Sequence, residues 1–477
     1  MGIHSKSGLF AIVLLAGIAA PQDAVVPSPV TSRSPGPTPS ADGYIVIFAN
    51  GTSRAERANA SIAAGARVRQ NYTGMDAAAV TVPNANALDT LRHNSRVVRV
   101  VPDYIVRSGA KGGGRGGSPP PPAPVVFDTR QLISSGVQRV GMPITGSDGA
   151  GIGIAVVDSG IDFNHPDLAP APNSAGTAFT AIPGGTSCQD DGGHGTHVSG
   201  LIAALNNSIG VVGVAPAATL YCVKVLASDL TGTDSGVLAG LDWVLQHHNS
   251  VDPPIRVVNM SLGRTLDPGE TPATSVFRPL IQSLYNLGIV VVASAGNDPT
   301  LQISDVVPAG IPEVLAVAST VASNGIRTCF LLGLDIGAVS ADAASVFTTD
   351  GAGVAISAPG EEWTDIVSLP VLDCQGLQYG TLSTTLGTGG ATRKLVPSLV
   401  EARGTSFSAA LVSGVVARVL QKTLVPLDSG ATTVEGVRNW LHNNSSRLGV
   451  APVDNPLGPL YSNTFDNVRE GIAQAPQ

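Results

Sequence analysis

The sequence predicts an α/β protein in which helices cover both faces of a parallel central sheet. From about Gln131 onward, nearly continuous apolar runs such as "GIGIAVVD", "TLYCVKVL" and "IVVVASAG" alternate with helix-like stretches such as "SGVLAGLDWVLQHH". Strands that are apolar on both sides belong to a sheet whose two faces are both buried. A small α+β domain is expected before it at 44–107, where apolar strands alternate with "SRAERANASIAAG" and "ANALDTLRHN".

The flanking segments predict an exported chain with two linkers. Residues 1–20, "MGIHSKSGLFAIVLLAGIAA", have a weakly basic start, a short apolar run and small residues at the end, which is typical of a secretory signal peptide. The apolar run is too short to span a bilayer, so we expect a secreted, extracellular protein with no membrane span. Composition then divides the remainder into a Pro/Ser-rich linker at 21–43, a Gly/Pro-rich linker at 108–130, the main domain at 131–455 and a C-terminal tail at 456–477.

Charge and cysteine content restrict the class of protein further. The 477 residues carry a net charge of -8, which argues against nucleic acid as the main partner, because phosphate binding needs a basic surface. The small domain holds eight arginines against four acidic residues, so it is basic and should attract the acidic remainder. Four cysteines in an exported chain of this length indicate one or two disulfides, and we expect a monomer.

Three glycine-flanked motifs contain the residues of an acyl-transfer site. Asp158 ends the apolar strand "GIAVVD", His194 lies in "GHGTHVSG", and Ser406 lies in "GTSFSAALVSG" at the start of a long apolar helix. A serine hydroxyl becomes a nucleophile when an imidazole takes its proton and a carboxylate fixes the imidazole tautomer. The simpler interpretations are a buried capping aspartate and an N-cap serine. The glycines before Asp158 precede a strand instead of following one, so a nucleotide site is not favoured.

The stretch "CQDDGGHGTHVSG" also permits a metal site. Within ten positions it places Cys188, Asp190, Asp191, His194 and His197, which are residue types that bind transition metals. From these residues alone, a metal centre in a hydrolase of another class and a catalytic base both remain open.

Taken together, the three motifs, in the order Asp, His, Ser, resemble the subtilisin-like serine peptidases over residues 131 to about 455. The resemblance implies a subtilisin-like fold and a secreted serine endopeptidase that works through an acyl-enzyme intermediate. It gives the triad roles to Asp158, His194 and Ser406, and the role of oxyanion donor to the side-chain amide of Asn297 in "SAGN". Asp190 and Asp191 would then shape a solvated turn.

The resemblance also implies how a peptide substrate is held. The family binds an extended peptide as an added strand between two exposed edges, which reads little sequence. A pocket for the residue before the scissile bond implies broad specificity with an apolar preference there, although Asp298 at its rim could admit basic residues. The implied substrate-binding residues are Leu230, Thr231, Gly232, Ser261, Leu262, Gly263, Ser294, Ala295, Gly296 and Val306.

A structural calcium ion and an inhibitory propeptide are implied in the same way. The loop "ALNNSIGV" resembles the family's calcium loop, in which oxygen ligands surround the ion. The implied ligands are the side chains of Gln131, Asp167 and Asn207 and the carbonyls of Leu205, Ile209 and Val211. The basic domain at 44–107 resembles the propeptides that occupy the cleft until cleavage, which would start the mature chain near Arg130 or Gln131.

The sequence departs from the family pattern at several places. Ala410 stands where the family most often has proline, Phe407 replaces the usual methionine beside the nucleophile, and residues 361–403 form an unusually long connection. The expected cysteine pairs are Cys188 with Cys222 and Cys329 with Cys374. A non-catalytic, peptide-binding relative is therefore a competing interpretation.

Overall fold

We describe the fold from a computed structural model of the chain. The predicted signal peptide at 1–20, the segment 109–130, Cys374 and most of the connection 361–403 lie outside the described residues. All described residues except Gly36 belong to one compact unit, Pro37–Gln477. The structure describes residues 36–108, 131–141, 144–322, 325–329, 334–339, 341–345, 347–361, 381–385, 398–446 and 470–477.

The central sheet has seven strands, which are all parallel, in the order β16-β13-β11-β9-β5-β7-β6. Strands β5 and β11 are fully buried, and β7 and β9 are buried except for Thr219 and Arg256, in line with their largely apolar sequences. The strands are β5 (Gly153–Asp158), β6 (Ala178–Thr180), β7 (Thr219–Lys224), β9 (Ile255–Met260), β11 (Val290–Ser294), β13 (Leu315–Val321) and β16 (Val354–Glu361).

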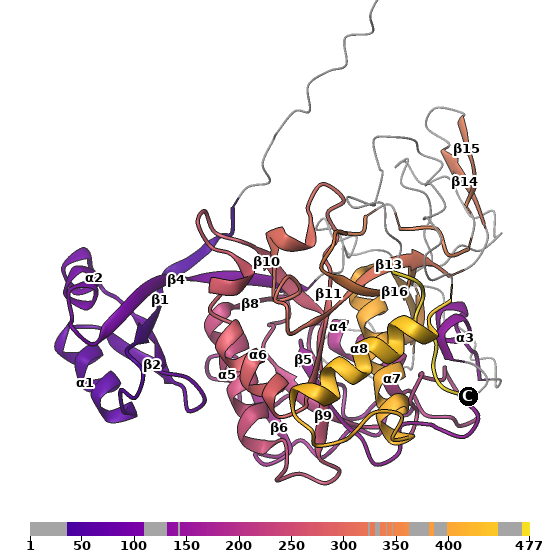
Figure 1. The fold of residues 1–477 in the computed structure, drawn as a ribbon, viewed down its shortest axis with the longest axis horizontal. Coiled ribbons are helices and arrows are strands. Elements are labelled where there is room, and N and C mark those ends of the chain that lie inside the picture. Colours follow the sequence, from indigo (N-terminus) through magenta and orange to yellow (C-terminus); the bar gives the residue numbers. More distant parts are fainter. Residues whose placement is uncertain are drawn as a thin grey trace, which may run out of the picture. The chain divides into compact units, whose positions relative to one another are not determined.

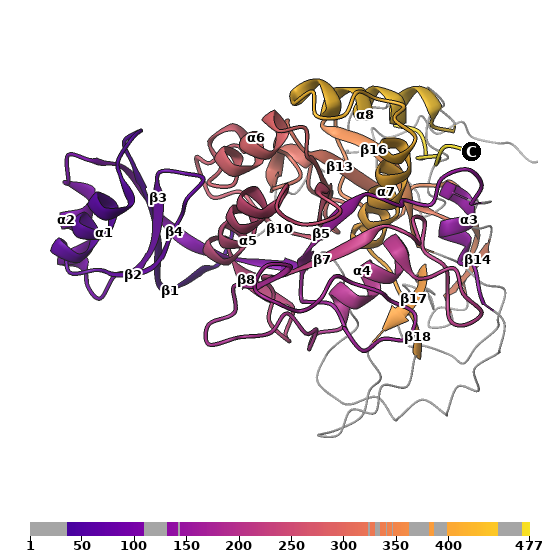
Figure 2. The same cartoon turned by 90° about the horizontal axis from the view of Figure 1, so that it is seen from below.

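Helices cover both faces of this sheet, which confirms the predicted fold class (Figure 2). Ile154 and Val156 of β5 pack in one apolar cluster with α3, α4, α7 and α8, whereas Ala155 and Val157 pack in the other with α5 and α6. The alternation follows from the two-residue period of a strand. The helices are α3 (Ser135–Gly141), α4 (His194–Ala203), α5 (Asp234–His247), α6 (Arg278–Asn286), α7 (Thr405–Gln421) and α8 (Ala431–Asn444).

The small domain is α+β, as predicted, with an antiparallel sheet and two helices (Figure 1). Its first helix begins with a capping box, in which Ser53 accepts from the Glu56 N–H and the Glu56 carboxylate accepts from the Ser53 N–H. Its own apolar core lies between the helices and the sheet. The elements are β1 (Pro39–Phe48), α1 (Arg54–Ala63), β2 (Arg67–Asn71), β3 (Ala77–Thr81), α2 (Ala85–Arg92) and β4 (Val97–Ser108).

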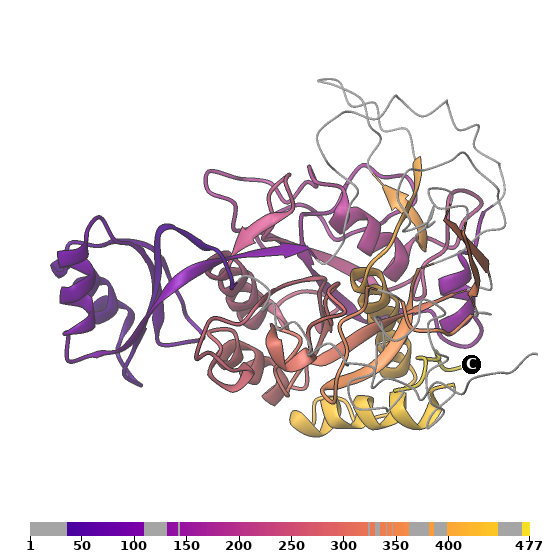
Figure 3. The ribbon, with the colours of Figure 1, turned by 90° about the horizontal axis from the view of Figure 1, so that it is seen from above.

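Strand β4 extends from the small domain into the main domain (Figures 1 and 3). There it pairs antiparallel with β8 (Thr231–Thr233) and with β10 (Leu262–Thr265), and β10 pairs in turn with β12 (Val306–Val307). A single antiparallel set of strands therefore joins the two domains.

The remaining described elements complete the main domain. They include two short 3-10 helices, Pro272–Thr274 and Ile303–Asp305, and two hairpins, Gly325–Cys329 with Leu334–Val339 and Thr381–Thr385 with Ser398–Ala402. Residues 470–477 of the predicted tail pack against the main domain, where Ile472 bridges to Ser357. In the part of the chain that the structure describes, no helix is long and apolar enough to cross a membrane.

Candidate active site

The first two site residues meet at the carboxyl edge of the central sheet. Asp158 is the last residue of β5, and His194 is the first residue of α4. Gly193 precedes the helix with φ +88°, a backbone conformation that glycine adopts at no steric cost. The Nδ1 of His194 lies 2.8 Å and 3.0 Å from the two carboxylate oxygens of Asp158, and both side chains are buried. This bond leaves Nε2 as the nitrogen available to accept a proton.

Burial alone would lower the pKa of His194, because it disfavours the imidazolium ion. The charge and hydrogen bond of Asp158, together with the charge of Asp190, outweigh this effect and raise the pKa above its ordinary value of 6.5. The Nε2 atom is buried and has no hydrogen-bond partner among the described residues. The imidazole is therefore oriented by the hydrogen bond at Nδ1, while Nε2 forms no hydrogen bond with the described residues.

Ser406 lies in the first turn of the buried helix α7. Its hydroxyl donates to the carbonyl oxygen of Ser261 at 3.3 Å and not to His194, while the Ser261 hydroxyl donates to the Ser406 carbonyl at 2.9 Å. The ring of the next residue, Phe407, has its centroid 5.8 Å from that of His194. The residue after Ser406 thus packs near the imidazole, while the Ser406 hydroxyl is turned toward Ser261. Helix α7 runs unbroken through Ala410, as expected for alanine in place of proline.

Asn297 is oriented by a residue that the sequence analysis missed. The backbone N–H and the hydroxyl of Thr405 both donate to Asn297 Oδ1 at 3.0 Å. This arrangement points the amide nitrogen of Asn297 away from Thr405, and Nδ2 is buried with no hydrogen-bond partner in the described parts of the chain. The only sequence signal was the position of Thr405 directly before Ser406.

Phe407 packs against both histidines of the H-G-T-H motif. Its ring stacks on His197 with centroids 4.3 Å apart and is tilted toward His194. His197 lies on α4 one turn after His194, and its ring forms part of the packing between α4 and α7.

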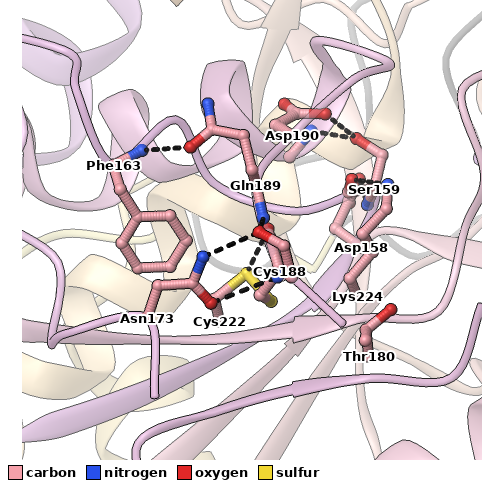
Figure 4. Close-up of a disulfide and its surroundings, with 12 residues drawn as sticks. Asp158, Ser159, Phe163, Asn173, Thr180, Cys188, Gln189, Asp190, Cys222 and Lys224 are labelled. Atoms are coloured by element: carbon pink, nitrogen blue, oxygen red, sulfur yellow. Dashed lines mark hydrogen bonds between the residues drawn. A yellow bond between two sulfur atoms is a disulfide. The ribbon is translucent and has the colours of Figure 1, made fainter. Parts of the chain in front are cut away.

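The expectation that Asp190 lies in a solvated turn is wrong. Asp190 is 2% exposed, and its carboxylate accepts a hydrogen bond from the Ser159 hydroxyl (Figure 4). It also accepts hydrogen bonds from the N–H groups of Gly192 and Gly193 and from the N–H and hydroxyl of Thr196. It therefore shapes the turn that leads into α4 from inside the protein. Asp191 is the more exposed of the two, and it forms an ion pair of 2.6 Å with Lys224.

The disulfide predicted between Cys188 and Cys222 is present, and both cysteines are buried (Figure 4). It links the segment before His194 to strand β7. A cysteine in a disulfide does not bind a metal, so this removes the first ligand of the alternative metal site. Within the described ranges, no group of three or more His, Cys, Asp or Glu residues could hold a metal ion. The second pair, Cys329 with Cys374, lies outside what can be described.

The residues implied in substrate binding fall in two places. One group lies at β8 and comprises Leu230, Thr231 and Gly232. A second group lies at β10 and comprises Ser261, Leu262 and Gly263. Strand β4 lies between these two edges and forms backbone hydrogen bonds with both. Ser294 ends β11, Ala295 and Gly296 follow it, and Ala295 shares an apolar cluster with Val306. The carboxylate of Asp298 accepts hydrogen bonds from Thr300.

The residues implied as calcium ligands lie together around one loop. The Gln131 amide nitrogen donates to the carbonyls of Leu205 and Val211 at 2.5 Å and 2.9 Å and lies 3.5 Å from Asn207 Oδ1. The carboxylate of Asp167 accepts from the Asn207 amide and from the Val211 N–H.

These donors fit calcium, which prefers oxygen ligands from carbonyls, amides and carboxylates. Turning the amide of Gln131 would present its oxygen to the space that Asn207 Oδ1 and the carbonyls of Leu205 and Val211 already face. Burial raises the pKa of Asp167 to about 7, although its hydrogen bonds with Val211 and Asn207 lower it, so a bound cation would stabilise its charged form. The Ile209 N–H donates to Asn207 Oδ1, which closes the loop.

Comparison with known proteins gives consistent matches. Residues 149–459 match the model of the subtilase family, Peptidase_S8. Subtilisin E of Bacillus subtilis (strain 168) is 34% identical over 306 residues, which is 62% of this chain and 70% of that protein. Subtilisin Savinase of Lederbergia lenta is 33% identical over 322 residues, which is 67% of this chain and 93% of that protein.

Among solved structures, the chain is similar to fervidolysin from Fervidobacterium pennivorans, which is described as a keratinolytic enzyme related to subtilisin. The TM-score is 0.59 at 20% sequence identity, and the match covers 91% of this chain and 60% of the fervidolysin chain. At this level of identity the likeness supports the fold.

Proposed function

This chain belongs to the subtilase family and is a serine endopeptidase, and from this premise we propose that Asp158, His194, Ser406 and Asn297 carry its reaction. One observation supports the proposal most. Two buried nitrogens, Nε2 of His194 and Nδ2 of Asn297, lack hydrogen-bond partners among the described residues, and each is fixed from its other side. Buried polar atoms of this kind are uncommon unless they serve a ligand or a reaction.

In the proposed mechanism, the Ser406 hydroxyl turns from Ser261 toward His194 and transfers its proton to Nε2 as the oxygen attacks the substrate carbonyl. The Asp158 carboxylate holds the imidazole in the required tautomer and stabilises the imidazolium ion that forms. His194 then gives the proton to the leaving amine. Water repeats the sequence on the acyl-enzyme and releases the second product.

The negative charge on the tetrahedral intermediate requires preorganised donors. Asn297 Nδ2 and the backbone N–H of Ser406 would supply two, and the hydrogen bonds from Thr405 fix the amide before the substrate binds. Since Nδ2 has no competing partner within the described chain, forming this hydrogen bond breaks none.

We further propose that the enzyme is secreted and made as a zymogen, with the domain 44–107 as its inhibitory propeptide. Strand β4 lies where a peptide substrate would add, between β8 and β10. Asp103 also accepts from the Ser235 N–H near the start of α5, and Asp242 of α5 accepts from the Thr73 and Gly74 N–H groups. These contacts support a blocked cleft until the linker 108–130 is cut, with the mature chain starting near Arg130 or Gln131.

The proposed substrates are proteins and peptides, with broad specificity and an apolar preference before the scissile bond. The shared apolar cluster of Ala295 and Val306 supports that preference. Calcium is the proposed structural cofactor: it would be held by Gln131, Asp167, Asn207 and the neighbouring carbonyls, and would stabilise the loop without taking part in the reaction.

Labelling with a phosphonofluoridate tests the central proposal. The secreted protein should react at Ser406, and the Ser406→Ala protein should neither react nor mature when expressed alone. N-terminal sequencing of both forms would locate the cleavage site in the active form. Absence of labelling in a correctly processed protein would contradict the proposed mechanism.

The competing interpretation, a non-catalytic peptide-binding relative, is not favoured, because the chain belongs to a family of serine endopeptidases. The Ser406 hydroxyl, which donates to Ser261, needs only to turn toward His194 for the proposed reaction.

A further inference from the structure

Arg264 of β10 carries a guanidinium group whose plane is fixed from three sides. Its Nε and Nη2 donate to the Asp234 carboxylate at 2.9 to 3.0 Å, and Nη1 and Nη2 donate to Glu270 at 2.7 Å and 3.0 Å. Nη1 also donates to the carbonyl of Thr265 at 2.9 Å. Two forked ion pairs of this kind hold both the position and the orientation of the cation. The N–H groups at the edge of the guanidinium are all engaged in these hydrogen bonds. A further partner can therefore contact Arg264 only through the flat faces of the guanidinium.

An aromatic residue of the small domain packs on this cation. The Arg264 Cζ atom lies 4.9 Å from the centre of the Tyr104 ring, and it lies 5.8 Å from the ring of Phe277. Burial and the nearby Asp267 carboxylate raise the pKa of the Tyr104 hydroxyl above its ordinary value. The ring of the tyrosine contacts Arg264, and Asp267 lines the same hollow as Tyr104. Tyr104 is 7% exposed.

The site lies beside a hollow between the two domains. A cavity of about 210 Å³ extends along Tyr104 and is bounded on the main-domain side by Arg264, Asp267 and Glu270. All three residues belong to the catalytic region, so they stay with the enzyme when the small domain leaves. The face of Arg264 that Tyr104 covers and the carboxylate of Asp267 would then be open to another aromatic side chain.

The strand register connects this site to the substrate cleft. Tyr104 lies in β4 directly before Ile105, whose partner is Thr233, and Arg107 pairs with both Thr231 and Gly263. A substrate bound in the place of β4 would follow the same path. Its residue at the position of Tyr104 would reach Arg264, well before the bond that is cut.

We propose that Arg264 and Asp267 form a remote subsite of the mature enzyme that selects an aromatic residue, and tyrosine above phenylalanine, in peptide substrates. This inference rests on the proposed function. A cation on an aromatic face contributes about 0.5 to 2 kcal/mol, which corresponds to an increase of roughly 2- to 30-fold in kcat/KM. The Asp267 carboxylate adds a preference for the tyrosine hydroxyl, because a hydrogen bond to a charged acceptor is stronger than one between neutral groups.

The test uses the mature wild-type enzyme and a peptide that follows the sequence of β4, acetyl-Pro-Asp-Tyr-Ile-Val-Arg-Ser-Phe 4-nitroanilide. Three further peptides replace its tyrosine by phenylalanine, alanine or lysine. The expected order of kcat/KM is tyrosine, then phenylalanine, then alanine and lysine, with tyrosine above alanine by roughly 5- to 30-fold. The gain is expected in KM and kcat/KM, since the subsite lies away from the reacting atoms.

Asp267→Ala separates the two contacts. In this variant tyrosine and phenylalanine should give equal kcat/KM values, and both should stay above alanine, because Arg264 is unchanged. Asp428→Ala, which removes an exposed carboxylate that pairs with Arg256 elsewhere, is the matched control and should keep the full order. Equal kcat/KM values for the tyrosine and alanine peptides would overturn the subsite while leaving the proposed function intact. Failure to cleave any peptide or any unfolded protein would overturn the proposed function and the subsite with it.

Discussion

The disulfide between Cys188 and Cys222 should stabilise the main domain by an amount that its loop length sets. The two cysteines are 34 positions apart, and both are buried. In the chain-entropy model, closing a loop of this length removes about 12.6 cal/mol/K from the unfolded chain, or roughly 3.8 kcal/mol at 25 °C. Replacing both cysteines by alanine should therefore lower the melting temperature by about 5 to 10 °C, given the shift per kcal/mol expected for a large domain.

The measurement is differential scanning calorimetry of Cys188→Ala/Cys222→Ala in a Ser406→Ala background, which prevents self-digestion. Several scan rates are needed, because unfolding of a large secreted protein can be irreversible. Reductant should lower the melting temperature of the Ser406→Ala parent toward that of the variant. Any further decrease that reductant causes in the melting temperature of the variant measures the contribution of Cys329 and Cys374 to stability. A decrease below about 2 °C in the oxidised variant would refute the loop-entropy reasoning.

Three further predictions concern the site. Asn297→Ala should reduce kcat by about 10²- to 10³-fold with little change in KM, because the side-chain amide is proposed to stabilise the transition state. Steady-state hydrolysis measures both constants, and a comparable rise in KM would contradict this role. His194 must be neutral to accept a proton, so activity should fall as the pH drops through its raised pKa. The acid midpoint of the kcat/KM profile should lie above pH 6.5 and should move to lower pH in Asp190→Asn. An unchanged midpoint in that variant would argue against an effect of the Asp190 charge on the pKa of His194. A calcium chelator should lower the melting temperature of the wild type, with recovery on added calcium but not zinc, and the effect should be smaller in Asn207→Ala.

Much of the architecture could be predicted from local sequence, because strands buried on both faces must be apolar throughout. The run "GIAVVD" predicted a buried strand that ends at Asp158, and the glycines around His194 and Ser406 marked the helix starts. The four cysteines predicted one or two disulfides, but the sequence only suggested which cysteines pair, and the fold brings Cys188 and Cys222 together.

Contacts between distant residues could not be read in this way. Asp190 is hydrophilic and lies among glycines, which is typical of an exposed turn, yet its hydrogen bonds with Ser159 and Thr196 are formed inside the protein. The sequence showed a small basic domain and two candidate edges, but not that β4 inserts between those edges.

The sequence by itself determined the order of the catalytic motifs and the layers of the fold, because both depend on residues that are close together along the chain. The tertiary structure decided which polar groups are oriented by hydrogen bonds and which remain without a hydrogen-bond partner among the described residues. Thr405 orients Asn297 from 108 positions away, and Tyr104 reaches Arg264 only because β4 pairs with β10. Orientation by a hydrogen bond or a ring contact depends on distances of a few ångströms between such segments, and only the folded chain fixes those distances.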